Sequence, residues 1–273
     1  MLWCANAVLN CGRRSKRVKK AIFLFNRTRI MLKPWLDAGY ECWTLDGQHP
    51  EGVTTTPDGI KQVGMWFHAN RTAIQAHEVA KLVGGNVAFI ASFAECTFLT
   101  TSGARWLYHP DDKHLAVEER RPHPLYPNRK KDMADAIKLA KFVELVAACC
   151  QLMDGPYKSI PWMLENPATN FLNKRWRRPD HVFNPCDYGG YLPANTPHPY
   201  YPEFYPNNDA YTKKTGIWCG NGFVMPEKKP VEPVPGDFNK VTRQGGKSKN
   251  VKNVRSATPP GFARAVFEAN HHE

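Results

Sequence analysis

Two residues of this sequence combine a nucleophile with an acid at positions that a sheet could bring together. Cys96 lies in Ala94-Glu95-Cys96-Thr97, directly after an apolar run that is typical of a buried strand. Glu165 opens Glu165-Asn166-Pro167 at the end of a second such run, one helix later. A thiolate can attack a substrate while a nearby carboxyl group exchanges a proton with it. The pair therefore predicts covalent catalysis.

Alternating strands and helices must position these two residues. Apolar runs predict strands at 21–25, 40–45, 63–67, 86–92 and 160–164, and helical patterns cover a stretch that ends at Ala38, 72–83 and 132–153. This alternation indicates an α/β fold with a doubly wound, mostly parallel sheet. Ligands of such sheets bind outside the carboxyl ends of the strands. The residues to inspect at that edge are Phe25-Asn26, Asp46, His68, Glu95-Cys96 and Glu165-Asn166.

Three segments do not fit regular elements. Residues 107–131 are rich in Pro, His and Arg, and residues 186–210 hold five prolines among many tyrosines. The Lys- and Gly-rich stretch at about 226–254 predicts a mobile loop. We expect a basic N-terminal extension at 1–20 and one catalytic domain at 21–273, with a short insert region at about 186–254.

The charge balance favours a polyanionic partner. The chain has 37 Lys+Arg against 25 Asp+Glu, a net charge of +12, and its basic residues gather at 13–20, 120–131, 174–178 and 240–255. Lys and Arg near phosphates release condensed counterions on binding, and Phe171 and Trp176 could stack on bases beside the third cluster. Nucleic acid is the favoured partner; a basic protein without such a partner is the alternative.

Length and composition exclude other classes of protein. A chain of 273 residues with 42% hydrophobic residues can bury a core, which excludes wholesale disorder. No stretch approaches about 18 consecutive apolar residues, so no membrane span is expected. The N-terminus lacks the apolar region of a secretory signal, so we expect a cytoplasmic protein. The eight cysteines include no Cys-x-x-Cys pair, so we expect neither disulfides nor a bound metal.

Four motifs, in order, resemble those of the DNA cytosine-C5 methyltransferases, particularly their short phage- and prophage-type members. They are Phe25 with the stretch 34–41, Cys96 with 102–106 downstream, Glu165-Asn166-Pro167, and the late stretch 255–264, which resembles the family's Arg-x-x-Thr-Pro-x-x-x-Ala-Arg motif. Residues 211–218 lie where the family carries a basic motif that faces the target base. The resemblance spans roughly 21–270 and implies the Rossmann-like S-adenosylmethionine methyltransferase type of sheet.

The resemblance implies a concrete reaction, the transfer of a methyl group from S-adenosyl-L-methionine to C5 of cytosine in DNA. The target cytosine would be flipped out of the duplex, and the Cys96 thiolate would add to its C6. Glu165 would hold the N3/N4 edge and share a proton with N3, which makes C5 nucleophilic. After methyl transfer, loss of the C5 proton would release the enzyme.

The same resemblance assigns further residues. Asp46 would accept hydrogen bonds from the cofactor ribose, and Phe25, Asn26 and Thr28 would also bind the cofactor. The residues implied to contact DNA or the target base are Arg105, Asn166, Lys213, Lys214, Arg255 and Thr258. The insert region would serve target recognition. Because only about forty residues separate Lys214 from Arg255, this part is short for base readout, and we expect low sequence specificity. We expect a monomer.

Departures from the family pattern leave two alternatives. The first loop reads Phe25-Asn26-Arg27-Thr28-Arg29-Ile30, without the glycines that are usual there. Glu95 precedes Cys96 where proline is usual, and a carboxylate beside the thiol should raise the thiol pKa unless a lysine compensates. One alternative is a catalytically impaired homologue that binds DNA, and the other is an enzyme that modifies free cytosine nucleotides.

Overall fold

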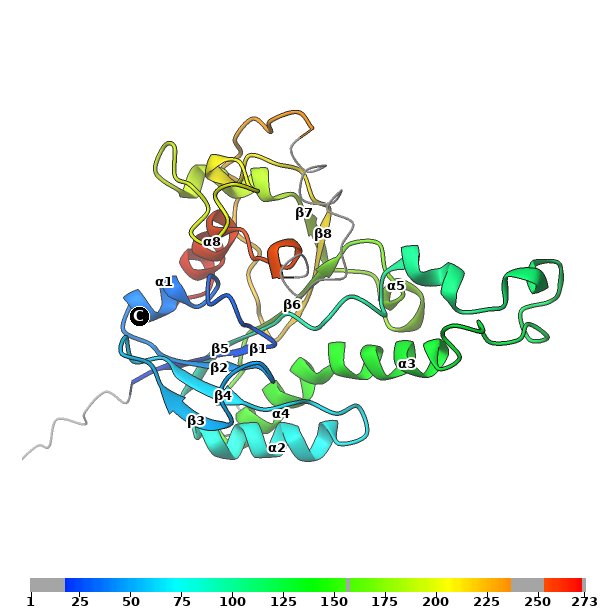
Figure 1. Ribbon diagram of the computed structural model, residues 1–273. Helices are drawn as coiled ribbons and strands as arrows, with labels where there is room; N and C mark the ends of the chain where they lie inside the picture. Colours follow the sequence, from blue (N-terminus) through cyan, green and yellow to red (C-terminus); the bar gives the residue numbers. More distant parts are fainter. Residues whose placement is uncertain (1–17, 156–157, 237–252, 272–273) are drawn as a thin grey trace, which may run out of the picture.

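The computed structural model describes residues 18–155, 158–236 and 253–271 (Figure 1). Most of the predicted extension at 1–20 and much of the stretch at 226–254 therefore lie outside the described residues. The same holds for most of the basic clusters at 13–20 and 240–255.

An eight-stranded sheet in the order β3-β4-β2-β1-β5-β6-β8-β7 forms the centre of the molecule. Strands β4, β2, β1, β5 and β6 pair in parallel, whereas β3 runs antiparallel to β4 and β8 runs antiparallel to both β6 and β7. The prediction of an α/β fold with a mostly parallel sheet is confirmed. The strands are β1 (Lys20–Leu24), β2 (Glu41–Leu45), β3 (Gly52–Thr55), β4 (Lys61–Gly64), β5 (Val87–Ser92), β6 (Trp162–Pro167), β7 (His181–Phe183) and β8 (Thr215–Gly220).

Helices cover both faces of this sheet (Figure 1). Because successive side chains of a strand point to opposite faces, β1 supplies Ile22 and Leu24 to the core under α2 and α4, and Ala21 and Phe23 to the core under α1 and α8. The helices are α1 (Lys33–Asp37), α2 (Thr72–Val83), α3 (Arg129–Ala140), α4 (Phe142–Asp154), α5 (Leu172–Arg175) and α8 (Pro260–Asn270).

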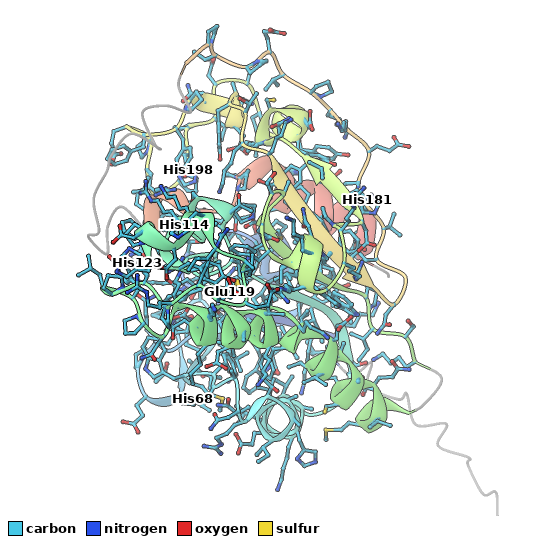
Figure 2. All side chains as sticks on the ribbon, turned by 90° about the vertical axis from the view of Figure 1, so that its right-hand side faces the viewer. His68, His114, Glu119, His123, His181 and His198 are labelled. Carbon is cyan, nitrogen blue, oxygen red and sulfur yellow. The ribbon has the colours of Figure 1, made fainter. Side chains whose placement is uncertain are left out.

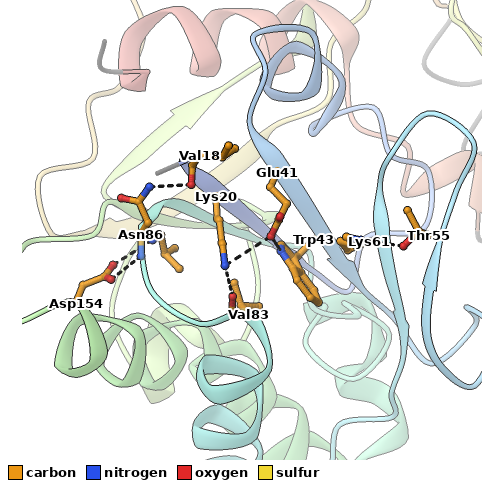
Figure 3. Close-up of polar contacts among 10 residues, drawn as sticks. Val18, Lys20, Glu41, Trp43, Thr55, Lys61, Val83, Asn86 and Asp154 are labelled. Carbon is orange, nitrogen blue, oxygen red and sulfur yellow. Dashed lines mark hydrogen bonds and ion pairs between the residues drawn. The ribbon is translucent and has the colours of Figure 1, made fainter. Parts of the chain in front are cut away.

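Side chains at the amino-terminal edge of the sheet fasten the helices to the strands (Figure 3). The Asp154 carboxylate at the end of α4 accepts hydrogen bonds from the backbone N–H groups of Asn86 (2.5 Å) and Val87 (3.1 Å). Lys20 donates to the Val83 carbonyl at the end of α2 and lies 3.6 Å from the Glu41 carboxylate. The charged side chains at this edge therefore stabilise the fold. The carboxyl ends of the parallel strands lie at the opposite edge of the sheet.

Three predicted elements differ from the structure. The helix expected before Ala38 is confined to α1, because the Asn26 side chain accepts a hydrogen bond from the Arg29 N–H (3.0 Å) and holds the preceding loop in a local turn. The strand expected at 63–67 is β4 at 61–64. The helix expected at 132–153 is two helices, α3 and α4, which meet at Lys141, where ψ is −9°.

The segments predicted to be irregular are largely so. Residues 107–131 hold a short 3-10 helix (Pro110–His114) before α3 begins. Residues 186–210 hold most of a second (Pro185–Tyr191) and all of a third (Asn207–Asp209). Over the described part of the chain, no helix has the length and apolar character that crossing a membrane requires. Within those same residues, no three His, Cys, Asp or Glu side chains are grouped so that they could hold a metal ion.

Candidate functional site

The strand order places a topological switch point between β1 and β5. The chain continues from β1 to β2 on one side, and β5 pairs with the other side of β1. Doubly wound sheets bind ligands at such a point, outside the carboxyl ends of the strands. Phe25, Asp46 and Cys96 follow the ends of β1, β2 and β5, and Glu165 lies near the end of β6. The fold therefore collects the predicted residues along one edge.

The Cys96 thiol is half-buried and lies within electrostatic reach of four charged groups. Burial raises the pKa of the thiol above its usual value of 9.0. The Lys213 ammonium group opposes this rise, the Glu165 and Glu95 carboxylates add to it, and Arg255 opposes it more weakly. The compensating lysine that a carboxylate beside the thiol requires is therefore present, although the balance still favours the thiol over the thiolate.

Glu165 shares Lys213 with Cys96. Burial raises the pKa of the Glu165 carboxyl group, and Lys213 opposes the rise. The antiparallel pairing of β6 with β8 explains the proximity, because Pro167 lies opposite Thr215 and Lys213 comes two residues before it. The Lys213 Nζ also donates a hydrogen bond to the Arg255 carbonyl oxygen (3.0 Å), which ties the late motif to this edge of the sheet.

Asn166 positions the loop that carries Cys96. Its side chain is buried; Nδ2 donates to the Ala94 carbonyl oxygen (2.8 Å), and Oδ1 accepts from Asn170 Nδ2 (3.2 Å). The end of β6 is thus joined to the chain two residues before Cys96. The contacts of Asn166 seen in the structure are internal, and the contact with DNA implied for it stays a prediction.

Arg129, at the start of α3, holds the other side of the same loop. Its Nη2 donates to the Thr97 carbonyl oxygen (2.8 Å), and its guanidinium group lies 4.6 Å from the centre of the Phe98 ring. A Cβ atom on Gly103 would come within 2.3 Å of the same Nη2, so a larger residue there would displace the guanidinium group. In the sequence, Arg129 belongs to a basic cluster assigned to a polyanion, but in the fold it is buried and positions the Cys96 loop.

The first loop begins with backbone in an unusual conformation. Phe25 has a φ of 54°, in the left-handed region that favours glycine, and its ring packs at 5.0 Å from Phe67 in the core. Asn26 is buried, and its carbonyl oxygen accepts a hydrogen bond from the Thr44 hydroxyl (2.5 Å). Thr28 is half-buried within the same loop. The turn after β1 therefore forms without glycine. In the family that the chain resembles, glycines are usual at this turn.

An exposed tryptophan, Trp66, lies beside Asp46, and the sequence pattern does not single it out. The Trp66 ring is 67% exposed and packs so closely on Gly47 that a Cβ atom there would lie 2.1 Å from it. Gln75 of α2 holds the Trp66 segment, because its Nε2 donates to the Trp66 carbonyl oxygen (2.9 Å) and its Oε1 accepts from the His68 N–H (2.8 Å). In the sequence Trp66 lies inside the run 63–67 that predicts a buried strand, whereas in the structure β4 ends at Gly64 and leaves the ring exposed.

Asp46 has one carboxylate oxygen in use. Its Oδ1 accepts a hydrogen bond from the Gln48 N–H (2.8 Å), and its Oδ2 has no hydrogen-bond partner among the described residues. Arg27 crosses from the first loop to the second, where its Nη1 donates to Gln48 Oε1 (3.1 Å). The two loops that would border a cofactor are therefore bridged by a side chain.

The remaining predicted residues fall into different settings. Arg255 is exposed and within electrostatic reach of Cys96, whereas Lys214 is exposed and is not among the groups that shift the Cys96 or Glu165 pKa. Thr258 is buried, with 1% of its surface exposed. Arg105 lies outside the sheet in the 3-10 helix Thr101–Trp106, with its guanidinium group 4.7 Å from the centre of the Trp106 ring.

Comparison with protein-family models and with curated proteins finds no match for this sequence. The function of the site is therefore inferred from its own residues and from the fold that collects them.

Proposed function

We propose that the protein transfers a methyl group from S-adenosyl-L-methionine to C5 of cytosine in DNA. The observation that carries the proposal is the meeting of Cys96, Glu165 and Lys213 at the carboxyl edge of the sheet, where each carboxylate or ammonium group shifts the pKa of the thiol. A mostly parallel sheet in which β8 runs against β6 agrees with the Rossmann-like methyltransferase type.

The reaction assigns one task to each of these groups. Cys96 Sγ forms a bond to C6 of the flipped cytosine while N3 receives a proton from Glu165, and the electron pair of the C5=C6 bond becomes available at C5. S-adenosylmethionine, when bound, would supply the electrophilic methyl group to that carbon and leave as S-adenosylhomocysteine. Transfer of the C5 proton to solvent water would then restore the C5=C6 bond as Cys96 Sγ leaves as the thiolate, and Glu165 would recover the proton from N3.

The raised pKa values suit this proton balance. A buried Glu165 with a raised pKa keeps a proton available for N3 closer to neutral pH than an exposed glutamate would. The thiol of Cys96 must lose its proton to attack, and the positive charge of Lys213 stabilises the thiolate that results. Lys213 therefore acts on both partners from a position two residues before β8.

Three features at the other half of the edge fit an adenosyl group. The free Oδ2 of Asp46 can accept hydrogen bonds from ribose hydroxyl groups, as an acid does in dinucleotide-binding sheets. The exposed Trp66 ring, fixed against Gly47, offers a flat apolar surface to an adenine ring. The left-handed Phe25 turns the backbone sharply at the end of β1, where the cofactor would approach.

Trapping the covalent intermediate tests the proposal. DNA that contains 5-fluorocytosine has no C5 proton to lose, so the Cys96–C6 bond should persist after methyl transfer. We expect a protein–DNA adduct that survives denaturation and maps to the peptide that contains Cys96. No adduct on DNA in the presence of S-adenosylmethionine would contradict the proposal, and an adduct with free 5-fluorodeoxycytidine monophosphate alone would indicate the nucleotide-modifying enzyme.

One observation favours the catalytically impaired homologue as a second candidate. The Arg27 side chain bridges to Gln48 across the two loops that would border the cofactor. Calorimetry with S-adenosylmethionine separates the two candidates, because an impaired homologue would bind DNA and show no heat of cofactor binding. An Arg27→Ala variant that gained cofactor binding would show that this bridge is the cause.

A further inference from the structure

The segment 101–128 forms an arm that leaves the sheet between β5 and α3. Figure 1 shows it projecting from the side toward which the carboxyl ends of β1 and β5 point, and Figure 2, which views the molecule from that side, marks it by His114, Glu119 and His123. The arm holds four Lys and Arg and four Asp and Glu, and Lys130 at the start of α3 adds a further cation beside it. None of the catalytic tasks described above uses this arm.

The arm contains a concave surface that combines cations with aromatic rings. Tyr108 lies beneath two cations, with Lys130 Nζ at 4.3 Å and the Arg120 guanidinium group at 5.7 Å from the ring centre. The Arg105 guanidinium group covers Trp106 in the same way. The lining of the concavity includes Arg105, Trp106, Tyr108, Lys113 and Arg120, and Lys130 lies beside it over Tyr108.

The cations of this surface are available to an anion. Among the described residues, Arg105, Lys113, Arg120 and Lys130 have no carboxylate within ion-pair distance. Arg120 is held in place by its own backbone contacts, donating from Nε to the Leu115 carbonyl oxygen (2.9 Å) and from Nη2 to that of Lys113 (3.0 Å). Several fixed positive charges without acidic partners form a surface complementary to a polyanion.

A separate ion pair builds the arm and leaves these cations unused. The buried Asp112 carboxylate accepts hydrogen bonds from the Arg121 backbone N–H (2.8 Å) and from Nε (3.0 Å) and Nη2 (2.7 Å) of its guanidinium group. Asp112 is the buried acid of the segment, and Arg121 neutralises it. The arm therefore has an internal brace that is independent of the concave surface.

The arm is also joined to the nucleophile loop. The N–H groups of Leu99 and Thr100 donate to the Cys96 carbonyl oxygen (2.9 and 3.0 Å), and the 3-10 helix that carries Arg105 follows at once. Arg129, which follows the arm, holds the Thr97 carbonyl oxygen. An anion on the concave surface thus lies on a segment whose two ends are both fixed to the Cys96 loop.

We propose that the concave surface of the arm binds the sugar–phosphate backbone of duplex DNA outside the target base. This inference rests on the proposed function, because it adds a second contact region to the same DNA. Lys and Arg contacts to phosphates position a duplex without reading its sequence, which agrees with a surface that offers charges and rings and few groups for base edges. The aromatic rings beneath the cations hold the cations in place. The same rings would offer apolar surface to the deoxyribose groups of the DNA.

Charge reversal with a matched control tests the inference. The variant Arg105→Glu/Lys113→Glu changes the net charge by the same amount as Lys81→Glu/Lys138→Glu, in which both lysines are exposed on α2 and α3, outside the arm and the sheet edge. Anisotropy with a labelled DNA duplex should show at least a tenfold weaker Kd for the arm variant alone. A neutral pair, Arg105→Gln/Lys113→Gln, should lower the slope of log K against log salt by about 2, since each phosphate contact contributes about 0.9.

The possible outcomes separate this inference from the proposed function. If the arm variant and the control weakened DNA binding equally, or if the neutral pair left the salt slope unchanged, the arm would not be a DNA contact. The proposed function would survive either result as long as the wild-type protein still bound and methylated DNA. Wild-type protein that bound a duplex RNA and no DNA would overturn both. Circular dichroism and thermal unfolding, measured for each variant, identify a variant that has failed to fold. If the charge-reversed arm variant does not fold, the salt slope of the neutral pair tests the arm as a DNA contact.

Discussion

The Arg129 guanidinium group donates a hydrogen bond to the Thr97 carbonyl oxygen (Nη2–O 2.8 Å) and so fastens the start of α3 to the loop that carries Cys96. On the other side, the Asn166 side chain holds the Ala94 carbonyl oxygen. Cys96 therefore lies on a short loop that is fixed at both ends by buried side chains, neither of which takes part in the proposed chemistry.

Removal of the Arg129 contact should loosen this loop. We expect Arg129→Met to lower the free energy of unfolding by about 2 kcal/mol, the usual contribution of a hydrogen bond from a charged group, and to reduce turnover at unchanged cofactor affinity. Denaturant unfolding measures the first effect and steady-state kinetics the second. Lys138→Met, on the exposed face of α3, is the control, and equal effects of the two substitutions would contradict the positioning role of Arg129.

The charges around Cys96 predict opposite effects of two substitutions on the reactivity of the thiol. Burial raises the Cys96 pKa, Lys213 lowers it and Glu165 raises it. Lys213→Gln should therefore slow alkylation of Cys96 by iodoacetamide between pH 7 and 9, and Glu165→Gln should speed it, because only the thiolate reacts. Peptide mass spectrometry follows Cys96 separately from the other cysteines.

The neighbouring lysine offers a matched control for this experiment. Lys214 is exposed and is not among the groups that shift the Cys96 pKa, so Lys214→Gln should leave the rate of alkylation unchanged. If Lys213→Gln and Lys214→Gln behaved alike, Lys213 would not be the group that stabilises the thiolate.

The exposed Trp66 ring should contribute to cofactor affinity. Loss of a stacking surface of this size corresponds to about 1–1.5 kcal/mol, so we expect Trp66→Ala to weaken S-adenosylmethionine binding by about tenfold in calorimetry. Tyr200→Ala removes another exposed ring (53% exposed) from the segment 186–210 and serves as the control. Unchanged affinity in Trp66→Ala would remove Trp66 from the cofactor site.

Asp209 makes the stability of the protein depend on pH. This carboxyl group is buried below the start of α8, where it accepts a hydrogen bond from the Gly261 N–H (2.7 Å), and burial raises its pKa from 3.8 to about 7. The folded protein holds the proton more tightly than the unfolded chain, so its stability should fall as the pH rises from about 4 to about 7.

Substitution of Asp209 by asparagine keeps the acceptor oxygen and removes the charge. We expect Asp209→Asn to flatten the pH dependence over this window and to exceed the wild-type stability at pH 8 by up to about 4 kcal/mol. Denaturant unfolding at pH 5 and pH 8 measures the difference. A wild-type protein whose stability rises across this window, or a variant with the same profile, would contradict the assignment.

Much of the sheet could be predicted because its central strands are buried on both faces. The runs 21–25, 40–45, 86–92 and 160–164 coincide with β1, β2, β5 and β6 to within about two residues at most bounds, and the ends of these strands carry Cys96 and Glu165. Strand β8 was missed because glycine, threonine and cysteine fill most of its six positions, leaving Ile217 and Trp218 as its large apolar residues.

The rest of the site depends on contacts between distant segments. The role of Arg129 follows from the packing of α3 under the Cys96 loop, and that of Trp66 from the close approach of its ring to Gly47. Lys213 was predicted to contact DNA, and its effect on both Cys96 and Glu165 follows from the antiparallel register of β6 with β8. A sequence shows the residue types at such positions and does not show their partners.

The central claim is methyl transfer to C5 of cytosine in DNA with Cys96 as the nucleophile. The most direct measurement incubates the full chain with duplex DNA and S-adenosylmethionine labelled in its methyl group, digests the DNA to nucleosides and identifies the labelled product. We predict 5-methyldeoxycytidine with the wild-type protein and none with Cys96→Ser. A wild-type protein that binds DNA and S-adenosylmethionine but forms no labelled 5-methyldeoxycytidine, or a Cys96→Ser variant that still forms it, would contradict this account.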